Sequence, residues 1–258
     1  MPELPEVEKA RALVEKKAGG RIIESVDDSD TYVCRPHAPG ELHDALAGRT
    51  VTGAGRVGKS FWLETDGGEG PELGLHLGMA GRIIVAGEGA GHPKPLRNPA
   101  WDRLTIAFAD GGALVMRDKR RLSRAVLNPD RSNLGPDAER ITREQFRRRV
   151  GRGRGPVKAR LMDQATIAGV GNLLADETLW QAGISPLHPA GELDHAELDH
   201  LRRELRAATR RAHRLGGVHK GQVIPYRRRG ASCPHCGEMM ERGKVGGRTT
   251  WWCPACQP

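Results

Sequence analysis

Two pairs of cysteines near the C-terminus have the spacing of a metal site. The motifs Cys233-Pro-His-Cys236 and Cys253-Pro-Ala-Cys256 are separated by sixteen residues. Each C-x-x-C motif can place two thiolates on one ion, and four sulfur ligands in tetrahedral geometry favour zinc. A redox pair is the weaker alternative, because one motif would suffice for it. The spacing therefore predicts one structural Zn²⁺, which would supply much of the folding free energy of so small a module.

The N-terminal residues could supply a nucleophile. Removal of Met1 would leave Pro2 with a free secondary amine, whereas a retained Met1 would block it. An α-amine has a pKa of about 8, so a useful fraction is neutral near neutral pH. A position near a helix N-terminus would further disfavour the protonated amine. The alternative is that Pro2 merely begins a helix and that the neighbouring Glu3 is an ordinary helix-terminal acid.

Basic residues are clustered along the chain, whose formal net charge is +9. Residues 147–160 carry seven Arg or Lys and no acid, and residues 202–229 carry ten with one acid. Such patches indicate a polyphosphate partner, although charge alone fits a solvated basic surface equally well. No apolar run approaches the length of a membrane span, and the acidic, proline-rich N-terminus is unlike a signal peptide. We therefore expect a cytoplasmic protein with no membrane partner.

The first half of the chain predicts a leading helix followed by a β-sandwich or barrel, over residues 1–128. Val7, Ala10 and Val14 recur on one helical face, and Gly19-Gly20 ends the helix. Short strands separated by turn residues follow, as is typical of a sandwich. The expected strands are Arg21–Val26, Ser60–Glu64, Leu73–Met79, Arg82–Ala86, Arg103–Ala109 and Ala113–Arg117. We expect residues 87–99, rich in Gly and Pro, to form a mobile loop.

The second half predicts a linker over residues 129–140, a helical domain over 141–232 and the cysteine module over 233–258. Thr142 with Gln145, and Asp194 with Glu197, have the spacing of capping boxes. Helices are expected from these two caps, around 157–165, and from Asn172 to about Ala182. Asn172 is expected to cap its helix, in a turn whose backbone amides suit a phosphate.

Four motifs in this order resemble those of the formamidopyrimidine-DNA glycosylase/endonuclease VIII family. They are Pro2-Glu3-Leu4-Pro5-Glu6-Val7-Glu8, His76-Leu77-Gly78-Met79-Ala80-Gly81, Gly169-Val170-Gly171-Asn172, and the segment from Arg248 to Cys256. The resemblance spans nearly the whole chain. It implies an α+β fold, with an N-terminal β-sandwich domain, a C-terminal helix–two-turn–helix domain and a β-hairpin zinc finger. It also implies a bacterial, nucleoid-associated enzyme of base excision repair, monomeric, with damaged double-stranded DNA as its partner.

The resemblance assigns catalysis to Pro2, Glu3 and Lys59, with Glu6 in support. Pro2 would attack the sugar C1′ and expel the damaged base, and the resulting cationic iminium would drive strand cleavage by β/δ-elimination. Glu3 would donate and accept protons as the deoxyribose ring opens, and Lys59 would contact phosphate and assist. Taken alone, Lys59 would be read as an ordinary solvated lysine between two strands.

The resemblance also assigns residues that contact DNA. His76, Lys158, Asn172, Tyr226 and Arg248 match positions that hold the DNA backbone, and such contacts fix register rather than sequence. Since the enzyme must extrude its target nucleotide, other residues must fill the gap. Met79 matches the methionine that fills it, and Arg120 the arginine that faces the orphaned base. The plain alternative is a surface role for each, and a core position for Met79.

Three departures from the family pattern concern the lesion. The family's Asp-Pro-Arg-Arg-Phe reads Asp118-Lys-Arg-Arg-Leu122 here, Trp101 stands where histidines are usual, and the connector 218–232 is short. We therefore predict a DNA glycosylase with AP lyase activity whose substrate is an oxidised purine or, alternatively, a pyrimidine, abasic or bulky lesion. The rival interpretations are a non-catalytic zinc-finger protein that binds damaged DNA, and an RNA-binding ribbon protein. Intact Pro2, Glu3 and Lys59 argue against the first, and the second would not require the N-terminal signature.

Overall fold

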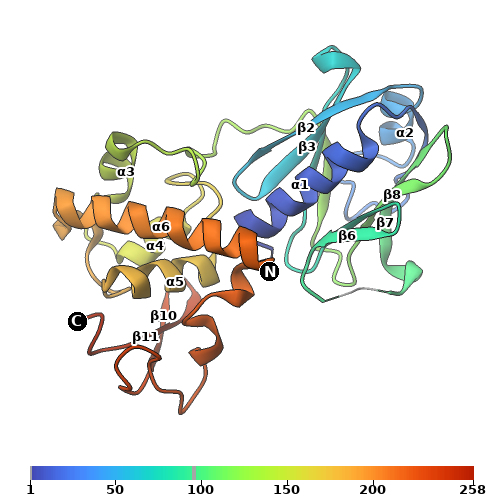
Figure 1. Ribbon diagram of the computed structural model, residues 1–258. Coiled ribbons are helices and arrows are strands. Elements are labelled where there is room, and N and C mark those ends of the chain that lie inside the picture. Colours follow the sequence, from blue (N-terminus) through green and yellow to red (C-terminus); the bar gives the residue numbers. More distant parts are fainter. Residues whose placement is uncertain (1, 95–96) are drawn as a thin grey trace. The chain divides into compact units, whose positions relative to one another are not determined.

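The computed structural model describes residues 2–94 and 97–258 (Figure 1). The chain forms two compact units. The first contains Pro2 and residues 6–131, and the second contains residues 3–5 and 132–258. Residues 3–5 therefore count with the second unit although they lie at the start of the chain. In the part of the chain that the structure describes, no helix has both the length and the apolar character needed to cross a bilayer.

The first unit is built on two antiparallel sheets and the helix α1 (Leu4–Ala18). The five-stranded sheet has the order β1 (Ile23–Asp27), β7 (Asp102–Phe108), β8 (Ala113–Arg117), β5 (Arg82–Val85) and β6 (Glu88–Gly91). The four-stranded sheet has the order β2 (Val51–Val57), β3 (Ser60–Thr65), β4 (Leu73–His76) and β9 (Arg124–Leu127). A short helix, α2 (Glu41–Leu46), lies between β1 and β2 in sequence.

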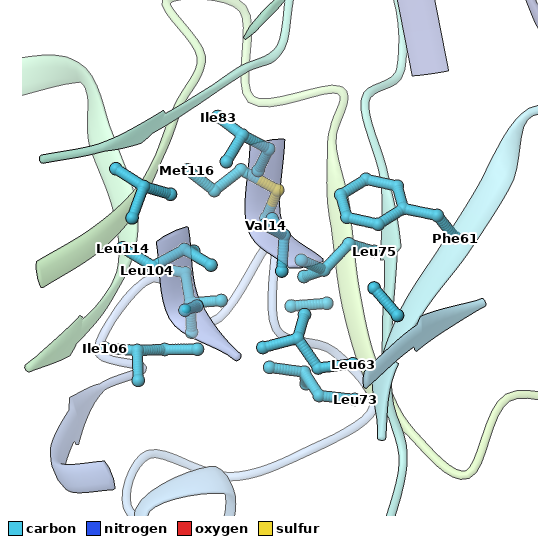
Figure 2. Packing of buried hydrophobic residues seen from close by; sticks show 14 of the residues in the cluster. Val14, Phe61, Leu63, Leu73, Leu75, Ile83, Leu104, Ile106, Leu114 and Met116 are labelled. Atoms are coloured by element: carbon cyan, nitrogen blue, oxygen red, sulfur yellow. The ribbon is translucent and has the colours of Figure 1, made fainter. Parts of the chain in front are cut away.

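One apolar core joins the two sheets, as Figure 2 shows. Phe61, Leu63 and Leu75 come from the four-stranded sheet, and Ile106 and Met116 from the five-stranded sheet. All five side chains are almost completely buried, and the buried Val14 of α1 belongs to the same cluster. Alternate residues of β3 and β8 point into this core, as expected for sheets with one solvated face. The predicted N-terminal sandwich with a leading helix is thus confirmed.

Several predicted elements of the first unit were wrong in extent. The strand expected to reach Met79 ends at His76, because residues 77–80 form a turn. Strands β2, β6 and β9 and helix α2 were not predicted. Strand β2 was missed because its sequence contains glycines, which are typical of turns. Glycine is needed at position 55, since a Cβ there would lie 2.2 Å from the Trp62 ring on β3. The expected mobile loop 87–99 contains β6, paired with β5, while residues 95 and 96 fall outside the described residues.

The second unit is a helical bundle followed by a hairpin. Its helices are α3 (Arg143–Val150), α4 (Val157–Met162), α5 (Asn172–Ala182) and α6 (His195–Leu215). Both predicted capping boxes are present, at Thr142 with Gln145 and at Asp194 with Glu197. Helices α5 and α6 lie side by side (Figure 1). Leu198, Leu201 and Leu205 of α6 belong with Leu174 and Leu179 of α5 to a second core, which also includes Leu4. The strands β10 (Glu241–Val245) and β11 (Arg248–Trp252) form the predicted C-terminal hairpin.

Candidate active site and DNA-binding surfaces

In the first unit, the sheet register brings Lys59 and His76 together. Lys59 occupies a two-residue turn between β2 and β3, in which Gly58 takes the left-handed φ of 59°. Ser60, the next residue, pairs with His76 at the end of β4. Burial, and the nearby Lys59 charge, lower the pKa of His76 below its usual value. His76 Nδ1 accepts a hydrogen bond from the Gly78 amide at 3.1 Å, so the neutral ring carries its proton on Nε2.

The Lys59 turn is held from α1 through Arg56. The Arg56 guanidinium contacts the Glu8 carboxylate at 2.7 Å and donates to the Gly58 carbonyl at 3.0 Å. Although burial opposes it, hydrogen bonds from Arg11 and Arg56 lower the pKa of Glu8. This places a fixed carboxylate behind the turn that carries the predicted catalytic lysine. Glu6, also predicted from the signature, is buried on the same helix.

Residues 118–123, which we call the wedge loop, are ordered around one carboxylate. Asp118 is fully buried, and it accepts hydrogen bonds from the amides of Arg120, Leu122 and Ser123 at 2.8–2.9 Å. The Arg120 side chain is exposed. The loop also abuts the Met79 turn, since a Cβ at Gly78 would lie 2.3 Å from the Leu122 carbonyl oxygen. The residues predicted to fill the gap and to face the orphaned base thus come from touching loops.

Two of the departures from the family pattern are partners in the structure. The Lys119 ammonium lies over the Trp101 ring, 5.2 Å from its centroid, which is within the range of a cation–π contact. The Asp118 amide donates to the Trp101 carbonyl at 2.9 Å. Trp101 and the wedge loop therefore form one continuous surface of the first unit.

In the second unit, Glu3 caps helix α5. Its carboxylate accepts hydrogen bonds from the amides of Gly171, Leu173 and Leu174 at 2.9–3.1 Å, and its side chain is 1% exposed. A Cβ at Gly171 would lie 2.1 Å from the Glu3 carboxyl carbon, so glycine is required there. Pro2, whose side chain is also buried, directly precedes this anchored residue. The nucleophile's neighbour is thereby fixed to the helix–two-turn–helix segment.

This arrangement corrects the expected role of Asn172 as a helix cap. The N-cap residue of α5 is Gly171, which has no side chain to cap the helix. The three backbone amides that were expected to face a phosphate already donate to the Glu3 carboxylate. Asn172 instead accepts from Lys158 Nζ at 2.7 Å and donates to the Thr249 carbonyl at 3.0 Å. It therefore joins α4, α5 and the hairpin.

Lys158 was predicted to contact the DNA backbone, but the structure buries its side chain. Its side chain is 0% exposed, and its ammonium contacts Asp176 Oδ1, Asn172 Oδ1 and Thr250 Oγ1 at 2.6–2.7 Å. The contacts with Asn172 and Thr250 are hydrogen bonds, and the contact with Asp176 is an ion pair. Burial lowers the pKa of Lys158, which the ion pair with Asp176 opposes. As the structure stands, no face of Lys158 is open to a phosphate. We call the residues Glu3, Lys158, Asn172, Asp176 and Arg227 the α5 network.

Arg227 completes the α5 network and sets the backbone beside Tyr226. Its guanidinium donates to Asp176 Oδ2 at 2.7 Å and to the Thr249 carbonyl at 3.2 Å. Tyr226 ends a short 3₁₀-helix (Ile224–Tyr226) and is 36% exposed. Arg248 is exposed at the start of β11, directly after the glycine turn of the hairpin. Both predicted contacts can therefore be reached from solvent.

The four predicted cysteine ligands converge. All four sulfur atoms lie within 4.8 Å of one another, with Cys236 and Cys253 at 3.4 Å and Cys233 and Cys256 at 4.0 Å. Ligands of a tetrahedral zinc at about 2.3 Å would lie about 3.8 Å apart, so the set fits a metal ion such as zinc. Burial alone would raise the pKa of Cys233, but the Trp180 indole N–H and neighbouring amides favour the thiolate and lower it to about 6. His235 lies within a motif and is exposed.

A sandwich domain, a helix–two-turn–helix domain and a four-cysteine hairpin together define the bifunctional DNA glycosylases. Residues 1–125 match the formamidopyrimidine-DNA glycosylase N-terminal domain, and residues 133–222 match the H2TH domain of the same enzymes. The chain belongs to the formamidopyrimidine-DNA glycosylase family. It is an enzyme of base excision repair, a DNA glycosylase, and AP lyase activity is general to the family.

Relatives and solved structures agree over the full length. The formamidopyrimidine-DNA glycosylase of Roseiflexus sp. (strain RS-1) is 35% identical over 280 aligned positions, covering all of both chains. That of Pelotomaculum thermopropionicum is 32% identical. Among solved structures, an LlFpg complex with THF-DNA and an inhibitor matches with a TM-score of 0.85, 29% identity and full coverage of both chains. MutM in complex with carbocyclic 8-oxo-G containing DNA matches at 0.84 and 28%, covering 99% of each chain.

Three features of these surfaces were not foreseen. They are the Glu3 cap on α5, the buried pairing of Lys158 with Asp176, and the Asp118 carboxylate beneath the wedge loop. Only the last has a local sequence signal, because a short acid followed within five residues by its own amide donors is a common turn pattern. The other two join residues far apart in sequence.

Proposed function

We propose that the mature chain removes damaged bases and cuts abasic DNA through the Pro2 amine. The observation that carries the proposal is the anchoring of Glu3, which fixes the residue next to the nucleophile by three amide donors. The amine would bond to the sugar C1′ as the bond to the base breaks, and cleavage of the C1′–O4′ bond with protonation of O4′ would open the ring and leave an iminium. The iminium takes up the C2′–H electron pair when the C2′ proton is lost. That pair then forms the C2′=C3′ bond as the 3′ phosphate leaves with the electrons of the C3′–O bond.

We propose that proton transfer and phosphate contact fall to separate residues. Three amide donors favour the ionised form of Glu3, so we propose that it accepts a proton before it returns one to the opening ring. Lys59, on its braced turn, would neutralise the phosphate that departs. His76 would donate its Nε2 hydrogen to a neighbouring phosphate as a neutral group. Tyr226 and Arg248 would hold the backbone of the same DNA.

The substrate class follows from the relatives. Similar enzymes have been solved with abasic-site DNA and with carbocyclic 8-oxo-G DNA. We propose that this chain acts as a monomer on abasic sites and on less stably paired lesions in double-stranded DNA. Leu122, Trp101 and Lys119 share one surface at the wedge loop, so the altered lesion recognition is concentrated there.

Borohydride trapping on an abasic-site duplex tests the nucleophile. Protein shown by mass spectrometry to lack Met1 should form a covalent complex, and Pro2→Gly should lose most of it. A chain that retains Met1 is the matched control and should not be trapped. Undiminished trapping of Pro2→Gly would instead make an amine such as Lys59 the nucleophile. Absence of trapping by the mature wild type would favour the non-catalytic damage-binding protein.

We also propose that the metal is one structural Zn²⁺ held by Cys233, Cys236, Cys253 and Cys256. When bound, the ion would supply folding free energy to the hairpin and no chemistry at the sugar. Metal analysis should find one zinc per chain, lost in the double variant Cys233→Ser/Cys253→Ser. Cys34→Ser is the control, because this buried cysteine lies in the first unit. Zinc retained by the double variant would refute the ligand set.

A further inference from the structure

Three arginines surround one exposed tyrosine in the first unit. The guanidinium carbons of Arg35, Arg124 and Arg121 lie 3.9, 5.1 and 5.7 Å from the centroid of the Tyr32 ring. The ring is 46% exposed, which is high for a large aromatic side chain. We call these four residues the Tyr32 cluster. None of them belongs to the catalytic or phosphate-binding set predicted from the sequence.

The Tyr32 cluster carries more positive charge than its acidic partner can balance. Asp30 contacts Arg121 at 2.7 Å and Arg103 at 3.6 Å, so it is already shared between two arginines. Arg35 and Arg124 both donate to one neutral acceptor, the Tyr32 carbonyl, at 2.5 and 2.8 Å. The ring face attracts cations but carries no net charge. An anion placed over the cluster would relieve the repulsion among its guanidinium groups.

The cluster is also ordered before any ligand arrives. Asp30 Oδ1 accepts from the amides of Tyr32 and Val33, which fixes the turn that presents the ring. On the other side, Asp118 binds the amides of the wedge loop, and Arg121 holds a left-handed φ of 54°. Side chains fixed in advance lose little conformational entropy on binding, so such a surface binds more tightly than flexible arginines would.

We propose that the Tyr32 cluster binds the sugar–phosphate backbone of the DNA strand opposite the lesion, an inference that rests on the proposed function. Guanidinium groups match phosphate oxygens in geometry as well as charge, and the exposed ring offers an apolar face to the adjoining sugar. The choice of DNA strand follows from the position of the arginines in the sequence. Arg121 and Arg124 flank Leu122 in the segment whose Arg120 is expected to face the orphaned base. Contacts of this kind would be independent of base sequence.

The salt dependence of binding tests the proposal. Affinity for a duplex with an uncleavable abasic analogue should be measured over a range of salt concentrations, for wild type and for Arg35→Gln/Arg124→Gln. Glutamine keeps a donor for the Tyr32 carbonyl but removes the charge. The slope of log K against log salt should become shallower by about 0.9 for each arginine that no longer meets a phosphate. Arg49→Gln, an exposed arginine that pairs with Asp66 in the same unit, is the control and should keep the wild-type slope.

Neutral methylphosphonates then locate the strand. Placed opposite the lesion, they should weaken wild-type binding but have little further effect on the double variant. An unchanged slope in the double variant would overturn the proposal, and so would a variant-dependent effect confined to the lesion strand. Borohydride trapping by the wild type at saturating DNA is the separate readout of the proposed chemistry. A wild type that binds through the cluster but is not trapped would therefore count against the proposed chemistry and not against this surface.

Discussion

The α5 network and the wedge loop solve the same problem, holding DNA-facing residues in place, in opposite ways. In the α5 network the side chains of Glu3, Lys158 and Asp176 are buried. Lys158 and Asn172 use their polar atoms on one another and on Thr249 and Thr250. In the wedge loop Asp118 and Ser123 are buried, and Asp118 fixes the backbone while Arg120 stays exposed.

The difference separates what must be constant from what can vary. The sugar and its phosphates are the same for every lesion, so the residues near the nucleophile can be held in fixed positions by hydrogen bonds and ion pairs between their side chains. Bases differ, so a rigid backbone that carries exposed side chains allows substitution at Trp101, Lys119 and Leu122 without loss of the loop. Two of the three departures from the family pattern, Trp101 and the segment 118–122, fall at the wedge loop. The third, the short connector 218–232, contains Arg227 of the α5 network, whose bond to Asp176 is present.

The largest expected effect is in the α5 network. Lys158→Met should lower the free energy of unfolding by about 3–5 kcal/mol, because it leaves the buried Asp176 carboxylate with Arg227 as its remaining charged partner. Urea unfolding would measure this. Lys244→Met, at an exposed position of β10, should change stability by less than about 0.5 kcal/mol. A stable Lys158→Met protein that fails only to bind DNA would show that Lys158 acts on phosphate after all.

A smaller effect is expected beneath the wedge loop. Asp118→Ala leaves buried amides without an acceptor, at a cost of about 1–3 kcal/mol. Because the loop then loses its fixed shape, we expect KM on abasic DNA to rise more than kcat falls. Fluorescence of 2-aminopurine opposite the lesion should report the loss of insertion. Asp110→Ala, at an exposed turn paired with Arg21, is the control. A fall in kcat with no change in KM would mean that Asp118 acts in the chemical step and not in binding DNA.

Lys59 and His76 should differ in how salt and pH affect them. Lys59→Met should make the slope of log K against log salt shallower by about 0.9, and His76→Gln should not change it, because His76 is neutral. The lowered pKa of His76 in the fold means that the unfolded chain takes up its proton first. The contribution of His76 to stability is therefore present above about pH 6.5 and is lost as pH falls through the lower folded pKa.

Comparing the free energy of unfolding at about pH 7.5 and about pH 5 for wild type and His76→Gln would test this, since the variant should lose less on acidification. An equal loss in the two proteins would mean that folding does not lower the pKa of His76.

The smallest expected effect concerns the lesion. Single-turnover cleavage of 8-oxoguanine opposite cytosine should be slower than cleavage of an abasic site, because the short connector leaves little chain to close over a flipped purine. Leu122→Phe should raise the 8-oxoguanine rate by up to about tenfold if aromatic stacking at the orphaned base was missing. Leu122→Met adds no ring and is the control. A wild-type 8-oxoguanine rate equal to the abasic rate would restore the ordinary family substrate.

What the sequence predicted well was local. Each capping box of α3 and α6 lies within a few residues, so the sequence pattern and the interaction that it predicts coincide. The four cysteines were found because metal ligands have fixed spacing. The Glu3 cap was out of reach, since its partners are backbone amides about 170 residues away that no side-chain pattern marks. Strand β6 was missed for the opposite reason, because its glycines satisfy a local rule for loops that pairing with β5 overrides.

The Glu3 cap also determines when during synthesis Met1 can be removed. Glu3 ends 1% exposed, bound to amides of residues 171, 173 and 174, and Pro2 before it is also buried in the folded chain. During synthesis those amides do not exist until Leu174 has been added. At 5–20 residues per second this leaves an interval of roughly 10–30 seconds in which the N-terminus has no helix to dock on. Removal of Met1, on which the Pro2 amine depends, is therefore expected to occur on the nascent chain, and protein refolded with Met1 still attached should be processed far more slowly than the same chain during translation.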